Sequence, residues 1–109
     1  EIDWQGAAQI RSSIPSTSIF VLPPSIDILA TRLRARGQDD DKVIQNRMAT
    51  AVREISHYRE FDYLVVNDDF ATTLENLKAI IVATRMKRAR QETQLQTTLT
   101  ALVDKNVDE

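Results

Sequence analysis

Residues 19–25, Ile-Phe-Val-Leu-Pro-Pro-Ser, decide the fold of this chain. Four apolar residues in a row, closed by two prolines, are typical of a short strand that is buried on both faces of a sheet. Ser25 then fits as the N-cap of a helix that continues through about Arg36. A second apolar run, Tyr-Leu-Val-Val at residues 63–66, leads through Asn-Asp-Asp into a long helix from about Ala71. Strands that alternate with helices through short connections predict an α/β fold with a mainly parallel sheet.

The opening of the chain and its middle complete this pattern. Residues 2–4 alternate between apolar and polar side chains and predict the end of a strand, whose first half we expect upstream. A short helix is expected over about residues 7–12. Another helix opens at the three aspartates 39–41, where negative charge suits the positive end of the helix dipole. The long helix after residue 71 is expected to continue or break near Arg90.

Composition narrows the class of protein. The chain has 109 residues, enough for one domain with a modest core, and its formal net charge is −2. That balance argues against a general binder of nucleic acid or anionic membranes. The absence of cysteine excludes disulfides, thiolate catalysis and cysteine-based metal sites. No apolar run approaches the length of a bilayer span, so we expect a soluble, cytoplasmic protein.

Arginines crowd one short stretch of this slightly acidic chain. Arg32, Arg34 and Arg36 alternate just before the aspartates, and Arg47 lies in the helix that follows. Guanidinium groups offer five donors in a rigid fork that matches phosphate, so two helices could close Arg36 and Arg47 over transferring phosphoryl groups. The alternative is a solvated helix face with ordinary ion pairs, and the pattern alone favours this second interpretation.

Other candidate residues have structural interpretations beside the functional ones. Asp3, at a strand end, could hold magnesium or a polar ligand, or it could cap a turn, and the two are equally supported. Residues 67–69 also work as a turn and helix N-cap. His57 has no second plausible metal ligand or nucleophile as a partner, and a packed or capping histidine at a helix end is expected. The basic residues between 85 and 90 fit a solvated face better than a nucleic-acid site.

Taken together, several stretches resemble guanylate kinases, and specifically the C-terminal half of the bacterial type. The resemblance extends to about Arg90 and depends on the order and spacing of five segments. They are Glu-Ile-Asp-Trp-Gln-Gly-Ala (1–7), Ile-Phe-Val-Leu-Pro-Pro-Ser (19–25), Arg-Leu-Arg-Ala-Arg-Gly-Gln (32–38), Ser-His-Tyr (56–58) with Phe-Asp-Tyr-Leu-Val-Val-Asn-Asp-Asp-Phe (61–70), and Leu-Lys-Ala-Ile-Ile (77–81).

The resemblance implies an architecture. It is part of a P-loop-type parallel sheet core that carries an inserted helical lid. Residues 1–31 would contribute core strands and helices, and residues 32–58 would form the lid. Residues 59–109 would supply a further core strand and the long C-terminal helix and tail.

The resemblance also implies roles for individual residues. Arg36 and Arg47 would reach the phosphates of both nucleotides as the lid closes. Arg32 and Asn67 would border the adenine of ATP, and Asp3 would lie on the GMP and magnesium side.

The implied reaction is transfer of the terminal phosphoryl group of ATP to GMP, with Mg²⁺ bound together with ATP. A chain with two glycines contains no glycine-rich phosphate loop. We therefore expect that loop and the GMP-binding segment upstream of Glu1, and we expect these residues alone to be inactive. The alternative function is a non-catalytic, guanylate-kinase-like domain that binds protein partners. An exposed sheet edge would also favour a homo-oligomer or a swapped dimer.

Overall fold

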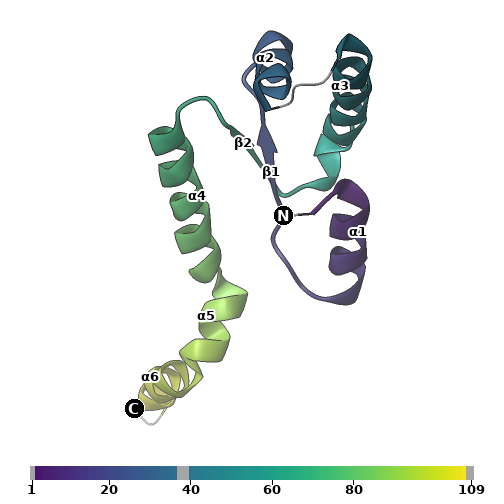
Figure 1. Cartoon of the computed structure of the whole chain (residues 1–109). Helices are drawn as coiled ribbons and strands as arrows, with labels where there is room; N and C mark the ends of the chain where they lie inside the picture. The colour runs from purple at the N-terminus through teal and green to yellow at the C-terminus, as the bar shows by residue number, and fades with distance from the viewer. Residues whose placement is uncertain (1, 37–39, 108–109) are drawn as a thin grey trace. The chain divides into compact units, whose positions relative to one another are not determined.

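The structure, a computed structural model, describes residues 2–36 and 40–107 (Figure 1). The predicted alternation of strands and helices is confirmed, and the chain divides at Leu74 into two compact units. The elements, in chain order, are α1 (Trp4–Ser13), β1 (Ile19–Leu22), α2 (Ile26–Arg36), α3 (Asp41–Ile55), the 3₁₀ helix η1 (Tyr58–Glu60), β2 (Tyr63–Val66), α4 (Phe70–Arg85), α5 (Arg88–Gln94) and α6 (Gln96–Val107).

The two strands form a parallel pair, as the sequence predicts. Ile19 lies opposite Tyr63, and the register continues to Leu22 opposite Val66. Hydrogen bonds extend the ladder at both ends: the Tyr63 N–H donates to the Ser18 carbonyl over 3.1 Å, and the Asn67 N–H donates to the Leu22 carbonyl over 2.7 Å. Helices α2 and α3 lie in the connection between the strands, as a parallel pair requires.

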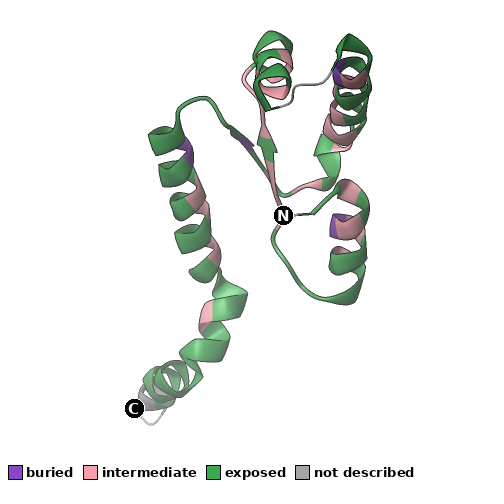
Figure 2. Ribbon diagram, in the orientation of Figure 1, coloured by how far each residue is buried: buried purple, intermediate pink, exposed green. Residues whose placement is uncertain are grey.

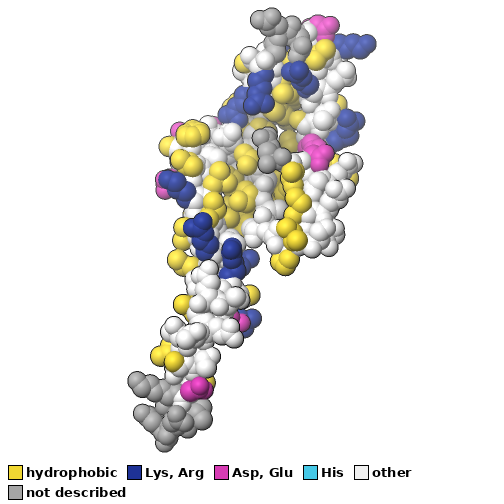
Figure 3. All heavy atoms as spheres, turned by 60° about the horizontal axis from the view of Figure 1, so that its bottom comes forward, with side chains coloured by type: hydrophobic (Ala, Val, Ile, Leu, Met, Phe, Trp, Pro, Cys, Tyr) yellow, Lys and Arg dark blue, Asp and Glu magenta, His cyan; other side chains and the backbone are white. Residues whose placement is uncertain are grey.

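The expected burial of both strand faces is wrong for the described chain. Val65 is only 4% exposed, but Leu64, Val66 and Val21 are 48%, 50% and 45% exposed. Figure 2 shows how few residues are fully buried, and Figure 3 shows hydrophobic side chains lying open to solvent. Neighbouring strand residues point to opposite faces, and two short strands with few neighbouring elements cannot be covered on both.

The strand end predicted at residues 2–4 is also wrong, because Trp4 already begins α1. Asp3 is the N-cap: its Oδ1 accepts a hydrogen bond of 2.7 Å from the Gly6 N–H, and its carbonyl accepts one of 2.9 Å from the Ala7 N–H. Such local bonds between side chain and backbone compete directly with strand formation. Glycine suits position 6, since a Cβ there would lie 3.2 Å from Asp3 Oδ1.

Side-chain caps also start the next two helices. Ser25 Oγ accepts from the Ile28 N–H over 3.1 Å, which confirms the predicted cap of α2. Asp40 Oδ1 accepts from the Val43 N–H over 3.0 Å at the start of α3. Asp39, one of the three aspartates expected to open this helix, lies outside the described residues. Helices α2 and α3 pack side by side, and Ile44 on α3 is 5% exposed (Figure 1).

The second unit contains most of α4 together with α5 and α6. Helix α4 ends at Arg85, a few residues before the break expected near Arg90. Two short-range bonds close it, from the Met86 N–H to the Ala83 carbonyl and from the Lys87 N–H to the Thr84 carbonyl. Helix α5 packs against α6. None of the described helices is long and apolar enough to cross a membrane.

Candidate functional site

The structure brings together the two residues predicted to border adenine. Arg32 Nη1 donates a hydrogen bond of 3.0 Å to the backbone carbonyl of Asn67. Asn67 follows β2, and its N–H is bonded to Leu22 at the end of β1. The contact therefore lies at the carboxyl ends of both parallel strands, the edge at which α/β sheets bind their ligands.

The turn after β2 is also the cap of α4. Asp69 Oδ2 accepts from the Thr72 hydroxyl over 2.7 Å and from the Thr72 N–H over 2.9 Å. The hydroxyl bond, and then the backbone bond, lower the pKa of Asp69 from its ordinary value because they stabilise the carboxylate. Thr73, which is 7% exposed, donates to the Val66 carbonyl over 3.2 Å. The interpretation of this segment as a turn and N-cap is confirmed.

Arg36 and Arg47 lie on the two helices that pack against each other. Arg36 is the last residue of α2, and Arg47 lies in α3. Both side chains are exposed, as is that of Arg34. Exposure leaves their guanidinium groups accessible to an anionic ligand, and their catalytic role stays a prediction.

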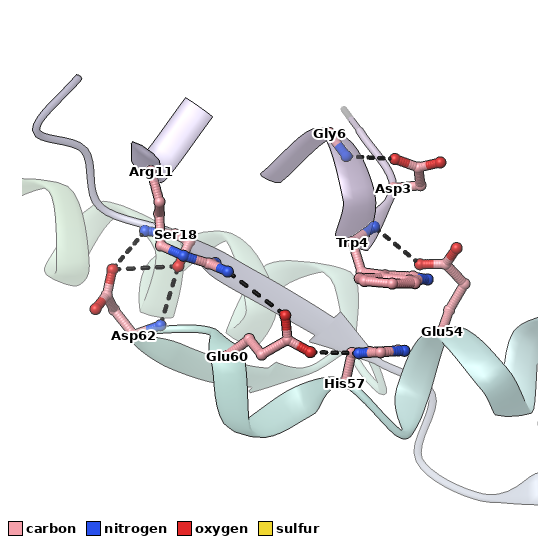
Figure 4. A network of polar contacts seen from close by, with 9 residues as sticks. All are labelled: Asp3, Trp4, Gly6, Arg11, Ser18, Glu54, His57, Glu60 and Asp62. Carbon is pink, nitrogen blue, oxygen red and sulfur yellow. Dashed lines mark hydrogen bonds and ion pairs between the residues drawn. The ribbon is translucent and has the colours of Figure 1, made fainter. Parts of the chain in front are cut away.

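Asp3 caps a helix, which is the structural one of the two interpretations that its sequence context allowed. Its Oδ1 caps α1, while its second oxygen points away from Gly6 (Figure 4). No group of three His, Cys, Asp or Glu side chains among the described residues is arranged to hold a metal ion. Mg²⁺ in nucleotide sites is bound mainly by phosphate oxygens and water with one or two carboxylates. One accessible carboxylate oxygen fits that mode.

A polar network that sequence reasoning missed surrounds His57. Its imidazole stacks on the indole of Trp4, with ring centroids 3.6 Å apart and planes 7° apart. The Trp4 N–H donates to Glu54 Oε2 over 3.2 Å, His57 Nδ1 contacts Glu60, and Glu60 Oε1 lies 3.6 Å from Arg11 Nη2 (Figure 4). The expectation of a packed histidine is confirmed. Glu60 is three residues from His57, but Trp4 is distant from it in sequence, and no local pattern indicated that stacking.

A cavity of about 670 Å³ opens within the first unit, beside β1. Its walls come from α1, the residues leading into β1, β1 itself, Glu54 and Phe61. Arg11 lines it, and its Nη1 is buried without a hydrogen-bond partner in the described chain. None of the five predicted site residues lines this cavity, which therefore differs from the candidate nucleotide site.

The basic residues near the end of α4 behave as a solvated face. Arg85 ends α4, Lys87 precedes α5, and Arg88 Nε lies 3.6 Å from Glu92 Oε1, one helical turn away. An exposed pair at this spacing contributes little. The interpretation as a solvated face is supported.

Comparisons with known proteins decide which family this arrangement represents. The family model for guanylate kinase matches residues 1–84. The chain belongs to the guanylate kinase family. It is 57% identical over 104 residues to the guanylate kinase of Alcanivorax borkumensis, covering 94% of this chain and 50% of that protein. It is 59% identical over 93 residues to that of Escherichia coli K12, covering 84% and 45%.

A solved guanylate kinase has the same fold over the shared region. The crystal structure of guanylate kinase from Anaplasma phagocytophilum superposes with a TM-score of 0.67 at 34% identity, over 82% of this chain and 41% of that one. This guanylate kinase chain thus spans about half the length of the curated relatives that it matches.

Proposed function

We propose that this chain is the C-terminal, lid-bearing part of a guanylate kinase that transfers the terminal phosphoryl group of ATP to GMP, giving ADP and GDP. The bond from Arg32 to Asn67 is the observation that carries the proposal. It joins two residues that the resemblance assigns to the adenine side, and it lies at the carboxyl ends of the two parallel strands. Because α/β sheets commonly bind ligands at that edge, the bond supports the proposal.

In the proposed reaction, the protein contributes position and charge. Phosphoryl transfer needs donors aimed at the oxygens on which negative charge develops. Arg36 and Arg47, exposed on paired helices, would supply those donors to the phosphates of both nucleotides. Mg²⁺, when bound with ATP, would neutralise charge on the phosphates, and Asp3 would lie on the GMP and magnesium side.

The lid would consist of residues 32–58, with residues 1–31 and 59–109 belonging to the core. The lid would therefore hold the end of α2, all of α3 and the start of η1. Its closure would exclude water from the phosphates, so that GMP receives the phosphoryl group.

A phosphate-binding loop and a GMP-binding segment would have to come from the half of the relatives that this chain does not span. The 109 residues contain two glycines, Gly6 and Gly37, which cannot form such a loop. We therefore propose that the chain alone lacks kinase activity.

The decisive experiment joins this chain, at Glu1, to the unmatched half of the Alcanivorax borkumensis guanylate kinase. GMP-dependent release of ADP from Mg²⁺-ATP is expected from the joined protein and not from the chain alone. Omitting GMP is the control for simple ATP hydrolysis. A folded joined protein without this activity would contradict the proposal.

The same joined protein separates the alternative function. A non-catalytic interaction domain exposes apolar surface to partners, and Leu64, Val66 and Val21 are each about half exposed here. A folded joined protein that binds neither nucleotide would favour that alternative. Size measurement of the chain alone would show whether these strands form a homo-oligomer or a swapped dimer, as an open sheet edge allows. A cytoplasmic location belongs to this proposal as well.

A further inference from the structure

Two aromatic rings join segments that are far apart in sequence. Trp4, the first residue of α1, and His57, just beyond α3, are both partly buried, and their rings are nearly parallel with centroids 3.6 Å apart. Figure 4 shows the rings lying face to face between α1 and the chain after α3. This stacking links α1 to the end of the proposed lid.

Polar contacts hold the backbone of Trp4 and the ring of His57. Glu54, in the last turn of α3, accepts from the Trp4 N–H over 3.2 Å and so satisfies a free donor at the positive end of α1. His57 Nδ1 contacts Glu60 of η1, whose other oxygen lies 3.6 Å from Arg11 of α1. The Trp4–Glu54 bond joins α1 to the end of α3, and the Arg11–Glu60 pair joins α1 to η1. The rings, Glu54 and Glu60 therefore form one connected unit, called the Trp4–His57 latch below.

We propose that the Trp4–His57 latch fixes the C-terminal end of α3 against the turn that carries Asp3, so that Trp4 and His57 are positioning residues of the lid. The positioning role depends on the proposed function, whereas the latch itself does not. Asp3 immediately precedes Trp4, so a latch that holds Trp4 also holds the Asp3 turn.

The geometry of α3 gives the latch a consequence at Arg47. A helix rises 1.5 Å per residue, so Arg47 lies about 12 Å along the axis from the end of α3 at Ile55. If that end is pinned, α3 can swing about it, and Arg47 follows a restricted arc. If the end of α3 is not held, the guanidinium of Arg47 can take many positions, and few of them lie near the phosphates. Misplacing a reacting group by about 1 Å can reduce rates on the order of a hundredfold.

The indole of Trp4 supplies a readout of the latch. The His57 ring covers one face of this indole, with ring centroids 3.6 Å apart. A small soluble quencher therefore reaches the indole less readily in the latch than it would reach an uncovered indole.

The test uses the 109-residue chain itself, which contains one tryptophan and one histidine. Quenching of Trp4 emission by added acrylamide is expected to be limited in the parent chain, because one face of the indole is covered. His57→Phe should keep the stacking and the parent's quenching, and His57→Leu should increase the quenching. Glu92→Gln, in the second unit, is the matched control and should behave as the parent.

Two results would contradict the proposed latch. A folded His57→Leu variant with the parent's acrylamide quenching excludes the stack. Far-UV circular dichroism would show whether His57→Leu still folds. If it does not, His57→Phe decides the question, because quenching above the parent's in the folded phenylalanine variant would overturn the stack.

Kinetics of the joined protein described above test the positioning role separately. His57→Leu is expected to lower kcat on the order of tenfold or more with little change in KM, and His57→Phe to restore most of it. Unchanged kcat in His57→Leu would overturn the positioning role. A joined protein with no activity but the expected fluorescence would instead contradict the proposed function and leave the latch standing on the chain's own result.

Discussion

Arg32 on α2 holds the carbonyl of Asn67 after β2 through a 3.0 Å hydrogen bond from Nη1. The bond links a side chain of the first strand–helix unit to the backbone that leaves the second strand. It therefore stabilises the edge of the sheet at which a nucleotide is proposed to bind.

Arg32→Ala should remove this hydrogen bond and lower the stability of the chain. A hydrogen bond from a charged donor at a partly exposed site contributes about 1 kcal/mol, and the free energy of unfolding should fall by about that amount. Urea denaturation of the chain measures it. Arg34→Ala is the matched control, since Arg34 is exposed on the same helix, and it should change stability little. Equal effects of the two substitutions would remove any special role of the Arg32 contact.

Arg36→Ala and Arg47→Ala should each reduce kcat of the joined protein on the order of a hundredfold or more. The reason is that each removes a charge proposed to stabilise the transferring phosphoryl group. Steady-state ADP release measures the effect, with Arg34→Ala as a control that keeps near-parental turnover. Near-normal turnover in both variants would defeat the lid assignment.

Asp69 should make the start of α4 sensitive to acid. Its pKa lies below the ordinary aspartate value, so its stabilising contribution is complete above that value and is lost as pH falls through the lowered pKa. Amide exchange at Thr72 and Thr73 should therefore accelerate below about pH 4, beyond the intrinsic pH trend.

Two substitutions at this position separate charge from capping. Asp69→Asn should keep the cap but lose the acid dependence, because asparagine caps helices without titrating. Asp69→Ala should expose the same amides at every pH. An Asp69→Asn variant with the parent's acid profile would show that another group is responsible.

Ser18→Ala should destabilise the segment just before β1 and β2. The Ser18 N–H donates to Asp62 Oδ2 over 2.9 Å, and the Asp62 N–H donates to Ser18 Oγ over 3.0 Å. Removing the hydroxyl should lower the free energy of unfolding by about 1 kcal/mol, measured by thermal or urea unfolding. Ser16→Ala is the matched control, because the exposed Ser16 hydroxyl makes no hydrogen bond within the described chain. Similar losses in both variants would argue against the reciprocal pair.

Local signals in the sequence predicted most of the elements correctly. Ser25, Asp40 and Asp69 each cap a helix through a bond to an N–H three residues away. Such bonds depend only on neighbouring residues, and the apolar run at residues 63–66 likewise marks its own strand. The strand end predicted at residues 2–4 was wrong for a local reason too. Alternation over three residues is too short to distinguish a strand end from a capped helix start.

Local patterns were enough to predict the parallel α/β order, the caps that start α2, α3 and α4, and the family, whereas the cap at Asp3 was one of two alternatives. Tertiary structure alone decided that Arg32 meets Asn67, that Trp4 stacks on His57, and that Leu64 and Val66 stay half exposed. The physical reason is range. Capping and periodicity are set within a turn or two of the chain, whereas these contacts and exposures depend on how distant elements pack, which no local pattern specifies.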